Sequence, residues 1–266
     1  MKSPLNYFGG KSRLSKVIVP MIPKDHICYC EPFAGGAWIL FGKEPSKVEV
    51  INDLDAELVT FWRVVQNHLE EFLRYFKWAI VSRHFFDLAN KQDPTLLTDI
   101  QRSVRYYYLQ RLGFGGRTDR RTWGISVSRP MSLNLETINN VLLETHWRLE
   151  RVTIERMDAC DCIRRYDRPT TFFYVDPPYH RVAQSYVHKF KDADFAMLKE
   201  TLSRISGKFI LSLNDSPSVR TMFKGYHINP VELKYSAGNS RQASDTRSEP
   251  RSELLISNFK PVSRGT

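Results

Sequence analysis

The chain has 266 residues, and its 42% hydrophobic content is enough to form a sizeable core, which excludes a wholly disordered protein. The 39 Lys and Arg residues against 29 Asp and Glu residues give a net charge of +10, which favours nucleic acid as a partner. No apolar run approaches the roughly 18 residues of a membrane span, and the N-terminus has no apolar signal-peptide core. We therefore expect a cytoplasmic protein that does not bind membranes.

The first part of the chain predicts alternating helices and strands. Hydrophobic periodicity and glycine turns give, in order, a helix over 11–22, a strand over 26–30, a helix near 36–43 and a strand over 47–53. From Asp55 to Phe76, apolar side chains recur every three or four residues on one face, which predicts a single long helix.

The middle of the chain has no clear alternation of strands and helices. Helices are expected over 99–112 and 133–150, the second capped by Ser132 or Asn134. Between them, the glycine-rich segment 113–130 predicts a loop rich in arginine. Its position and its aromatic residues favour duplex DNA recognition over a merely solvated loop, and the arginines expected to bind DNA are Arg117, Arg120, Arg121 and Arg129.

Alternation resumes after residue 150. The predicted elements are a strand over 151–158, a strand ending at Val175, a helix over 193–205, and strands over 207–215, 226–234 and 252–259. The sequence therefore predicts a split α/β domain, residues 1–62 and 151–266, interrupted by a largely helical and basic subdomain over 63–150.

Four predicted strands end in polar or glycine-rich sequences. These endings read EPFAGG (31–36), NDLD (52–55), MDA (157–159) and DPPY (176–179). Because ligands of open α/β sheets bind at the carboxyl ends of the strands, we expect the four endings to line one crevice.

The first two endings favour a cofactor that contains adenosine. Gly35 and Gly36 would let the backbone approach a ligand closely, and an acid at the end of the next strand, Asp53, could accept hydrogen bonds from both hydroxyls of a ribose. The alternative for Asp53 is a structural one, because either Asp53 or Asp55 could cap the following helix.

The four cysteines form two Cys-x-Cys pairs, Cys28/Cys30 and Cys160/Cys162, in or beside predicted strands. Zinc sites usually use pairs with two to four intervening residues, so we interpret all four as structural thiols and expect no metal site.

The set NYFGGKSRL, EPFAGGAW, NDLDAEL, MDA and DPPY, in that order, resembles the Dam-type (D12 class) DNA adenine-N6 methyltransferases. The resemblance covers 1–62 and about 151–266. It implies a Rossmann-like S-adenosylmethionine-dependent methyltransferase sheet with an inserted, mainly helical DNA-recognition subdomain. It further implies a site-specific enzyme on double-stranded DNA, encoded by a bacterium or a phage, with no obligatory protein partner and a monomeric state.

The resemblance also implies roles for particular residues. Those expected to bind the cofactor are Tyr7, Lys11, Phe33, Gly35 and Gly36 at the methionine part, Asp53 at the ribose and Asp158 at the adenine amino group, with Asp176 between cofactor and substrate. Two positions depart from the family pattern. Tyr7 stands where many members have tryptophan, and Ala159 stands where members often have an aromatic residue.

For catalysis the resemblance points to Asp176, Pro177 and Tyr179, although DPPY could also be a simple strand stop. An exocyclic amine is a poor nucleophile because its lone pair is delocalised into the ring. The Asp176 carboxylate and the Pro177 carbonyl can each accept one N–H of that amine and direct the lone pair toward the methyl group. Tyr179 would stack on the extruded base, and stacking contributes about 1–3 kcal/mol.

Two other functions fit much of this pattern. Cytosine-N4 methylation uses the same way of holding an amine. A catalytically inactive DNA-binding protein on the same fold is the alternative that is not an enzyme.

Overall fold

The computed structural model describes residues 1–5, 14–114, 121–124, 133–178, 190–233 and 251–261. These residues form a seven-stranded sheet in the order β3-β2-β1-β4-β5-β7-β6. The strands are β1 (Cys28–Glu31), β2 (Val48–Asn52), β3 (Val152–Glu155), β4 (Thr171–Val175), β5 (Lys208–Asn214), β6 (His227–Leu233) and β7 (Arg251–Ser257). Neighbours from β3 to β5 pair in parallel, whereas β7 is antiparallel to both β5 and β6.

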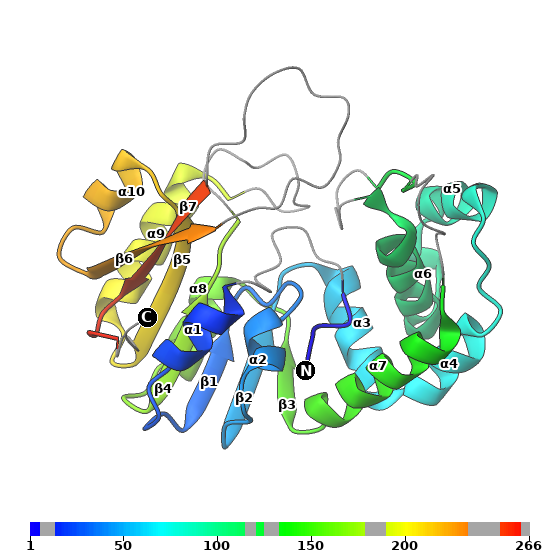
Figure 1. The fold of residues 1–266 in the computed structure, drawn as a ribbon, viewed down its shortest axis with the longest axis horizontal. Coiled ribbons are helices and arrows are strands. Elements are labelled where there is room, and N and C mark those ends of the chain that lie inside the picture. Colours follow the sequence, from blue (N-terminus) through cyan, green and yellow to red (C-terminus); the bar gives the residue numbers. More distant parts are fainter. Residues whose placement is uncertain (6–13, 115–120, 125–132, 179–189, 234–250, 262–266) are drawn as a thin grey trace.

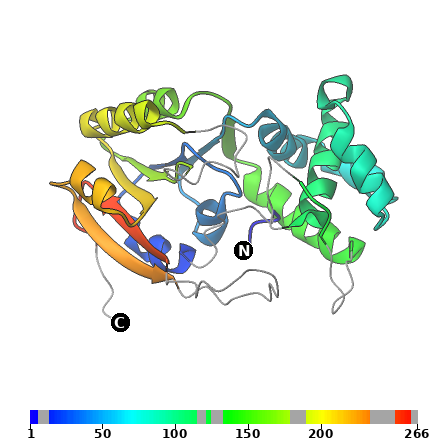
Figure 2. The ribbon, with the colours of Figure 1, turned by 90° about the horizontal axis from the view of Figure 1, so that it is seen from above.

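Helices cover both faces of the sheet (Figures 1 and 2). One face carries α1 (Ser15–Met21), α2 (Trp38–Gly42) and α3 (Ala56–Asn67), and the other carries α8 (Ala159–Tyr166), α9 (Asp192–Arg204) and α10 (Pro217–Met222). Side chains alternate along the central strand β4, so that Phe172 packs with the first group of helices and Phe173 with the second. Both rings are fully buried.

The remaining helices lie beside the β3 edge of the sheet, to the right in Figure 1. They are α4 (Leu69–Phe76), α5 (Arg83–Lys91), α6 (Asp99–Leu112) and α7 (Leu135–Leu149), with a short 3-10 turn at Pro94–Leu96. Their apolar side chains join the core on the α1–α3 face. Phe61 of α3 stacks on Tyr107 of α6 with ring centres 5.4 Å apart. The helical part therefore packs directly on the sheet domain through α3.

The order and type of the predicted strands are confirmed, but the helices needed correction. The long helix predicted from Asp55 to Phe76 is wrong, because the chain leaves the helical conformation at His68 (φ −137°, ψ 35°) and begins again as α4. Apolar periodicity cannot reveal the break, since Leu69 and Phe72 stay buried after it. Helices α5, α8 and α10 were not predicted. Cys160 and Cys162 lie in α8, shortly after β3.

All four cysteines are free thiols. Cys30 of β1 and Cys162 of α8 are fully buried, and their sulfur atoms are 3.8 Å apart. Burial raises the pKa of the Cys30 thiol, which keeps it protonated and unreactive. These thiols fill the core between the sheet and α8. Among the helices of the described ranges, none is long and apolar enough to cross a membrane.

Buried Asn52 joins the ends of three strands. Its Nδ2 donates to the carbonyl of Pro32, after β1, at 2.9 Å and to the carbonyl of Met157, after β3, at 3.0 Å. Its Oδ1 accepts from the backbone N–H of Met157 at 2.9 Å. One amide thus satisfies three backbone groups on either side of β2, and it fixes the spacing of the strand endings.

We predict that Asn52→Ala lowers the free energy of unfolding by about 2–4 kcal/mol, because each buried backbone group left without a partner costs about 1–3 kcal/mol. Urea denaturation measures the change. The matched control is Asn67→Ala, which removes an exposed amide bonded to the Arg63 carbonyl and should change the free energy by less than about 0.5 kcal/mol. Equal destabilisation in the two variants would contradict the role assigned to Asn52.

Candidate active site

A cavity of about 390 Å³ lies at the carboxyl ends of the parallel strands. All four predicted endings contribute to it, so the expectation that they line one crevice is confirmed. The lining residues are Pro32, Phe33, Asn52, Leu54, Met157, Asp158, Ala159, Cys160, Pro178, Phe190, Lys191, Asp194 and Met197. The volume is within the range of roughly 300–1,000 Å³ typical of cofactor sites, and the walls are mainly apolar.

At the β1 and β2 endings, Gly35 and Asp53 are in contact. Gly35 has φ +47°, a conformation that favours glycine, and its N–H donates to Asp53 Oδ2 at 2.9 Å. The other oxygen, Oδ1, accepts from the N–H of Asp55 at 3.0 Å. The helix cap is Asp55, whose side chain accepts from the N–H groups of Glu57 and Leu58. Asp53 is therefore not the cap of α3, and its half-buried carboxylate is held at the turn between β2 and α3.

Asp158, at the β3 ending, is the N-cap of α8. Its Oδ1 accepts from the N–H groups of Cys160 at 2.8 Å and Asp161 at 3.3 Å. These bonds fix the carboxylate at the cavity wall, and Oδ2 accepts no hydrogen bond from a described residue. Ala159 lies beside it in the same wall, so the side of the cavity where the family often has an aromatic residue is formed by a methyl group.

Asp176 and Pro177 directly follow β4, with the aspartate half-buried and the proline buried. Behind them, the side chain of Glu31 at the end of β1 is fully buried. Its Oε1 accepts from the Tyr29 hydroxyl at 2.6 Å and from the N–H of Leu40 at 2.7 Å. Burial raises the pKa of Glu31 to about 7, and the charge of Asp176 acts in the same direction.

A third acid, Glu253 of β7, is also buried and accepts from the Ser212 hydroxyl at 3.0 Å. The charges of these acids act on Tyr174 of β4. Burial raises the pKa of its hydroxyl, and Asp176, Glu253 and Glu31 raise it further. Several acids therefore lie close enough to Tyr174, near the β4 ending, to influence its hydroxyl.

Six of the predicted site residues are outside the described residues: Tyr7, Lys11, Tyr179, Arg117, Arg120 and Arg129. Arg121 is described. Its guanidinium group lies 4.9 Å from the ring centre of Tyr106, on α6. The described ends of the predicted arginine loop are paired, because the N–H of Phe114 donates to the Thr122 carbonyl at 2.8 Å. Gly113 and Trp123 form an antiparallel bridge beside this bond.

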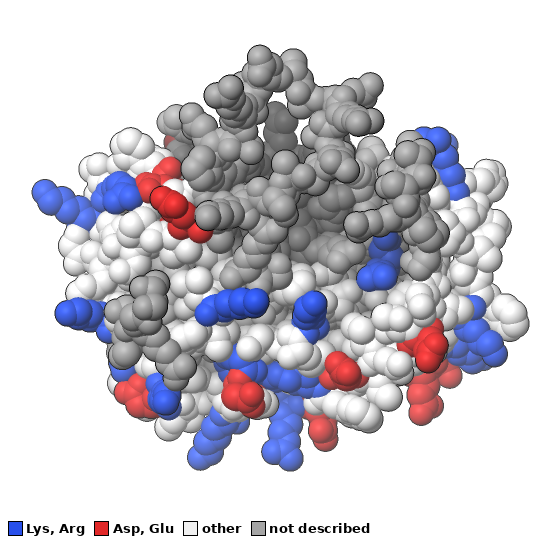
Figure 3. All heavy atoms as spheres, viewed as in Figure 1, with Lys and Arg blue, Asp and Glu red and all other residues white. Residues whose placement is uncertain are grey.

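The described surface shows no large patch of one charge on the face in Figure 3, where basic and acidic side chains are interspersed along the lower edge. Much of the chain's excess of Lys and Arg over Asp and Glu falls in sequence ranges outside the described residues.

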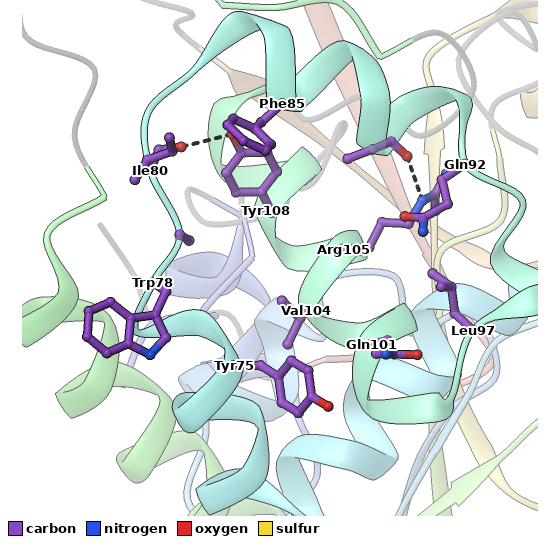
Figure 4. Close-up of a pocket in the computed structure, with 12 residues that line it drawn as sticks. Tyr75, Trp78, Ile80, Phe85, Gln92, Leu97, Gln101, Val104, Arg105 and Tyr108 are labelled. Atoms are coloured by element: carbon purple, nitrogen blue, oxygen red, sulfur yellow. Dashed lines mark hydrogen bonds between the residues drawn. The ribbon is translucent and has the colours of Figure 1, made fainter.

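A second pocket, of about 440 Å³, lies among α4, α5 and α6 (Figure 4). Its polar groups are engaged in its own walls. The Tyr108 hydroxyl donates to the Ile80 carbonyl at 2.9 Å, and Arg105 Nε donates to the Ala89 carbonyl at 2.6 Å. None of the predicted site residues lines it. This pocket is part of the packing of the helical region and is separate from the cavity at the strand ends.

The residues that form the strand-end cavity lie within a stretch that matches a known family. Residues 7–237 match the D12 class N6 adenine-specific DNA methyltransferases. The chain belongs to this family. It is therefore a DNA methyltransferase specific for adenine, and its methyl donor is S-adenosylmethionine.

Relatives of similar length support the assignment. The type II methyltransferase M1.LlaDCHI of Lactococcus lactis subsp. cremoris is 24% identical over 94% of this chain and 93% of its own. The type II methyltransferase M.CviBI of Paramecium bursaria Chlorella virus NC1A is 26% identical over 88% of this chain and 91% of its own. Among solved structures, the rRNA methyltransferase AviRa of Streptomyces viridochromogenes covers 93% of this chain and 84% of its own, but with 11% identity and a TM-score of 0.35 it adds nothing to the assignment.

The cavity fits S-adenosylmethionine chemically. Asp53 and Asp158 place carboxylates at two of the strand endings, and apolar side chains such as Phe33 and Pro178 form walls for a flat base. The acids beneath the β4 ending suit the positive sulfonium group.

Two contributors were missed by sequence reasoning. Asn52 directly precedes Asp53, and its polarity at the end of an apolar strand was the available signal. Glu31 is part of the EPFAGG ending, but a sequence does not show that an acid at a strand end is buried.

We predict that Glu31→Gln flattens the pH dependence of stability. The pKa of Glu31 is about 7 in the folded state, whereas its ordinary value is 4.5. Between these two pH values the folded state binds more protons than the unfolded state does. The stability of the wild type therefore falls as the pH rises from 4.5 to about 7. At about 1.4 kcal/mol per pKa unit, the decrease from this group is about 3 kcal/mol. Glutamine keeps an oxygen for both hydrogen bonds.

Thermal or urea unfolding between about pH 4.5 and pH 7.5 measures this effect. The stability of Glu31→Gln relative to wild type should increase with pH over that range. Glu70→Gln, at an exposed position on α4, controls for the removal of one acid. Parallel curves for wild type and Glu31→Gln would refute the prediction.

Proposed function

We propose that the protein methylates the N6 amino group of adenine at specific sites in double-stranded DNA, after extruding the target base from the duplex. The observation that carries the proposal is the cavity in which Asp158 and Pro178 lie beside the Asn52–Leu54 segment that holds Asp53. A mass-spectrometric search for N6-methyladenine, after incubation with duplex DNA and S-adenosylmethionine, tests the reaction. Sequencing methylated DNA from an expressing host tests site specificity.

For the cofactor, Asp53 accepts hydrogen bonds from the ribose hydroxyls, since each carboxylate oxygen can accept more than one hydrogen bond. Asp158, held by the first turn of α8, accepts from the adenine amino group through Oδ2. Phe33 and the two glycines border the methionine part, together with Tyr7 and Lys11. In this arrangement Glu31 and Asp176 would be the acids that accommodate the positive charge of S-adenosylmethionine.

The amine is held by the β4 ending. The Asp176 carboxylate and the Pro177 carbonyl each accept one N–H, which draws the nitrogen toward tetrahedral geometry and frees its lone pair. Bound S-adenosylmethionine would supply an electrophilic methyl group. Direct transfer to the amine nitrogen would break the sulfur–methyl bond as the nitrogen–methyl bond forms, release S-adenosylhomocysteine and free one proton of the amine, so the protein would form no covalent intermediate. The rigid turn at Pro177, buried behind the cavity wall, keeps the carbonyl in place.

The base is held by Tyr179, whose ring stacks on it. Extrusion costs a few kcal/mol, and stacking of about 1–3 kcal/mol together with the two hydrogen bonds offsets that cost. DNA is bound by the subdomain over 63–150, chiefly through arginines of the loop over 113–130. The protein acts as a monomer in the bacterial or phage-infected cytosol.

Two alternatives are less well supported. Cytosine-N4 methylation fits the amine-holding geometry but not the adenine-specific family. An inactive DNA-binding protein would not need acids at three strand endings around one cavity.

We predict that Asp176→Ala slows methyl transfer by at least about 10²-fold, which is the usual effect of removing one preorganised polar group that stabilises a transition state. Affinity for duplex DNA should change little, because phosphate contacts dominate it. Single-turnover formation of N6-methyladenine measures the rate. Asp161→Ala removes an exposed acid of α8 and should leave the rate unchanged. A near-normal rate in Asp176→Ala would reduce DPPY to a strand stop.

We predict that replacing Arg117 and Arg120 together weakens DNA binding or relaxes sequence preference. If both contact phosphates, the log–log dependence of affinity on salt becomes shallower by about 0.9 for each phosphate that is no longer neutralised. If they read guanine, the set of methylated sites broadens instead. Titration at several salt concentrations and sequencing of methylated DNA distinguish the two. If the salt dependence of DNA affinity and the methylated sequence both stay unchanged, the loop is not the element that recognises DNA.

A further inference from the structure

The pocket among α4, α5 and α6 holds one charged side chain, that of Arg105, and no acid is among its described lining residues (Figure 4). Its volume of about 440 Å³ lies in the range of small-molecule sites, which is roughly 300–1,000 Å³. Much of its wall consists of aromatic rings, which belong to Tyr75, Trp78, Phe85 and Tyr108. The rings of Tyr75 and Phe85 are exposed to solvent, so a ligand can reach them.

Arg105 is nearly buried, but most of its guanidinium group has no hydrogen-bond partner among the described residues. Its side chain is 10% exposed. The Nε–H donates to the Ala89 carbonyl at 2.6 Å, whereas Nη1 lies 3.8 Å from Glu57 Oε2, too far for a hydrogen bond. Neither Nη1 nor Nη2 donates to a described residue. The described walls therefore leave the four N–H groups of these two nitrogens without an acceptor.

The positive charge of Arg105 is also only partly neutralised. Its acid, Glu57, is shared, because Oε1 of the same carboxylate accepts from Arg102 Nε at 3.1 Å. Burial lowers the pKa of Arg105, the charge of Arg121 lowers it further, and Glu57 and Asp93 oppose this only in part. A nearly buried cation without a close acid is costly, and a bound anion would offset that cost.

A second donor lies at the same side of the pocket. Gln92 follows the last turn of α5, the helix whose Ala89 carbonyl accepts from Arg105. Figure 4 shows Gln92 and the guanidinium group on one side of the pocket, with the rings of Phe85 and Tyr108 on another. The Gln92 amide forms no hydrogen bond with a described residue, so its N–H groups can also face a ligand. The pocket thus combines hydrogen-bond donors on one side with aromatic rings on another.

We propose that this pocket binds a planar aromatic molecule that carries a carboxylate or a phosphate group. The Arg105 guanidinium, with Gln92 beside it, binds the anionic group, because its planar fork matches both kinds of oxyanion. The rings of Tyr75, Phe85 and Tyr108 pack against the flat part of the ligand. An aryl carboxylate and a nucleotide share this chemistry. The pocket is separate from the cavity at the strand ends, so the inference does not depend on the proposed function.

Calorimetry with two matched pairs of probes tests the site, in the presence of S-adenosylhomocysteine to fill the cofactor cavity. The first pair is 2-naphthoate and 2-naphthamide, which share the ring system and differ in charge. The second is thymidine 5′-monophosphate and thymidine. In at least one pair the anion should bind at least about 10-fold more tightly than its neutral partner, the usual effect of a hydrogen bond to a charged group. The pair that shows this difference identifies the anionic group as carboxylate or phosphate.

Variants of the chain locate the binding. Arg105→Gln should lower the affinity for the anion at least about 10-fold, to that of the neutral partner, and Arg105→Lys should retain part of it. Phe85→Ala removes an exposed ring of the wall and should weaken binding at least about 3-fold. Arg204→Gln removes the same charge from an exposed site on α9 and should leave the affinity unchanged.

Several results would overturn the inference. They are equal affinities for anion and neutral partner in both pairs, no binding of either anion at millimolar concentration, and equal losses in Arg105→Gln and Arg204→Gln, which would reduce the effect to net charge. Thermal melting checks that Arg105→Gln is folded. If it is not, Phe85→Ala decides, and an unchanged affinity in that variant excludes the pocket. Self-association of wild type that Phe85→Ala abolishes in sedimentation would mean that a second copy covers the pocket, which also overturns the inference.

Discussion

The site depends on one buried amide. Asn52 bonds to the backbone after β1 and after β3 at once, so three strand endings are held at fixed spacing by a single side chain. Parallel strands need such a side chain, because the loops that follow them leave the same edge of the sheet. The backbone hydrogen bonds between the strands do not connect these loops to one another. The backbone of Asn52 adds a fourth bond, from the N–H of Ala34 to its carbonyl at 2.8 Å. With these loops fixed, the N–H of Gly35 reaches the Asp53 carboxylate.

The second constraint is electrostatic. Acids gather beneath the β4 ending, and one of them, Glu31, is fully buried and accepts hydrogen bonds from a hydroxyl and an N–H. Such an arrangement costs stability in the free protein, since burial favours the neutral carboxyl. A cationic ligand nearby would favour the charged carboxylate instead, because its positive charge lowers the pKa of the acid. A sulfonium group close to these acids would therefore favour their charged form.

The sequence predicts secondary structure best where residues close in the chain determine it. Strands β1 to β5 and their polar endings could be predicted, because an apolar run that stops at an acid or a glycine has few alternatives to a buried strand. The break at His68 could not, since the apolar face continues through it. Helix α8 is hard to predict because its start signal, Asp158 as cap, fits a ligand at a strand end equally well. The inward position of Arg121 could not be predicted, because it depends on Tyr106, which belongs to another element.

The helical part is attached to the sheet by charge as well as by apolar packing. Arg148 of α7 reaches Glu49 of β2, with Nη2 2.8 Å from Oε1, and donates from the same nitrogen to the Leu40 carbonyl at 3.0 Å. Lys43 donates to the same Glu49 oxygen at 2.6 Å. All three side chains are at most 11% exposed, and opening such a group would leave an unpaired buried charge. Separating α7 from β2 would therefore cost the ion pairs of Glu49 as well as the apolar contacts of the core, so the helical part and the sheet form one packed unit.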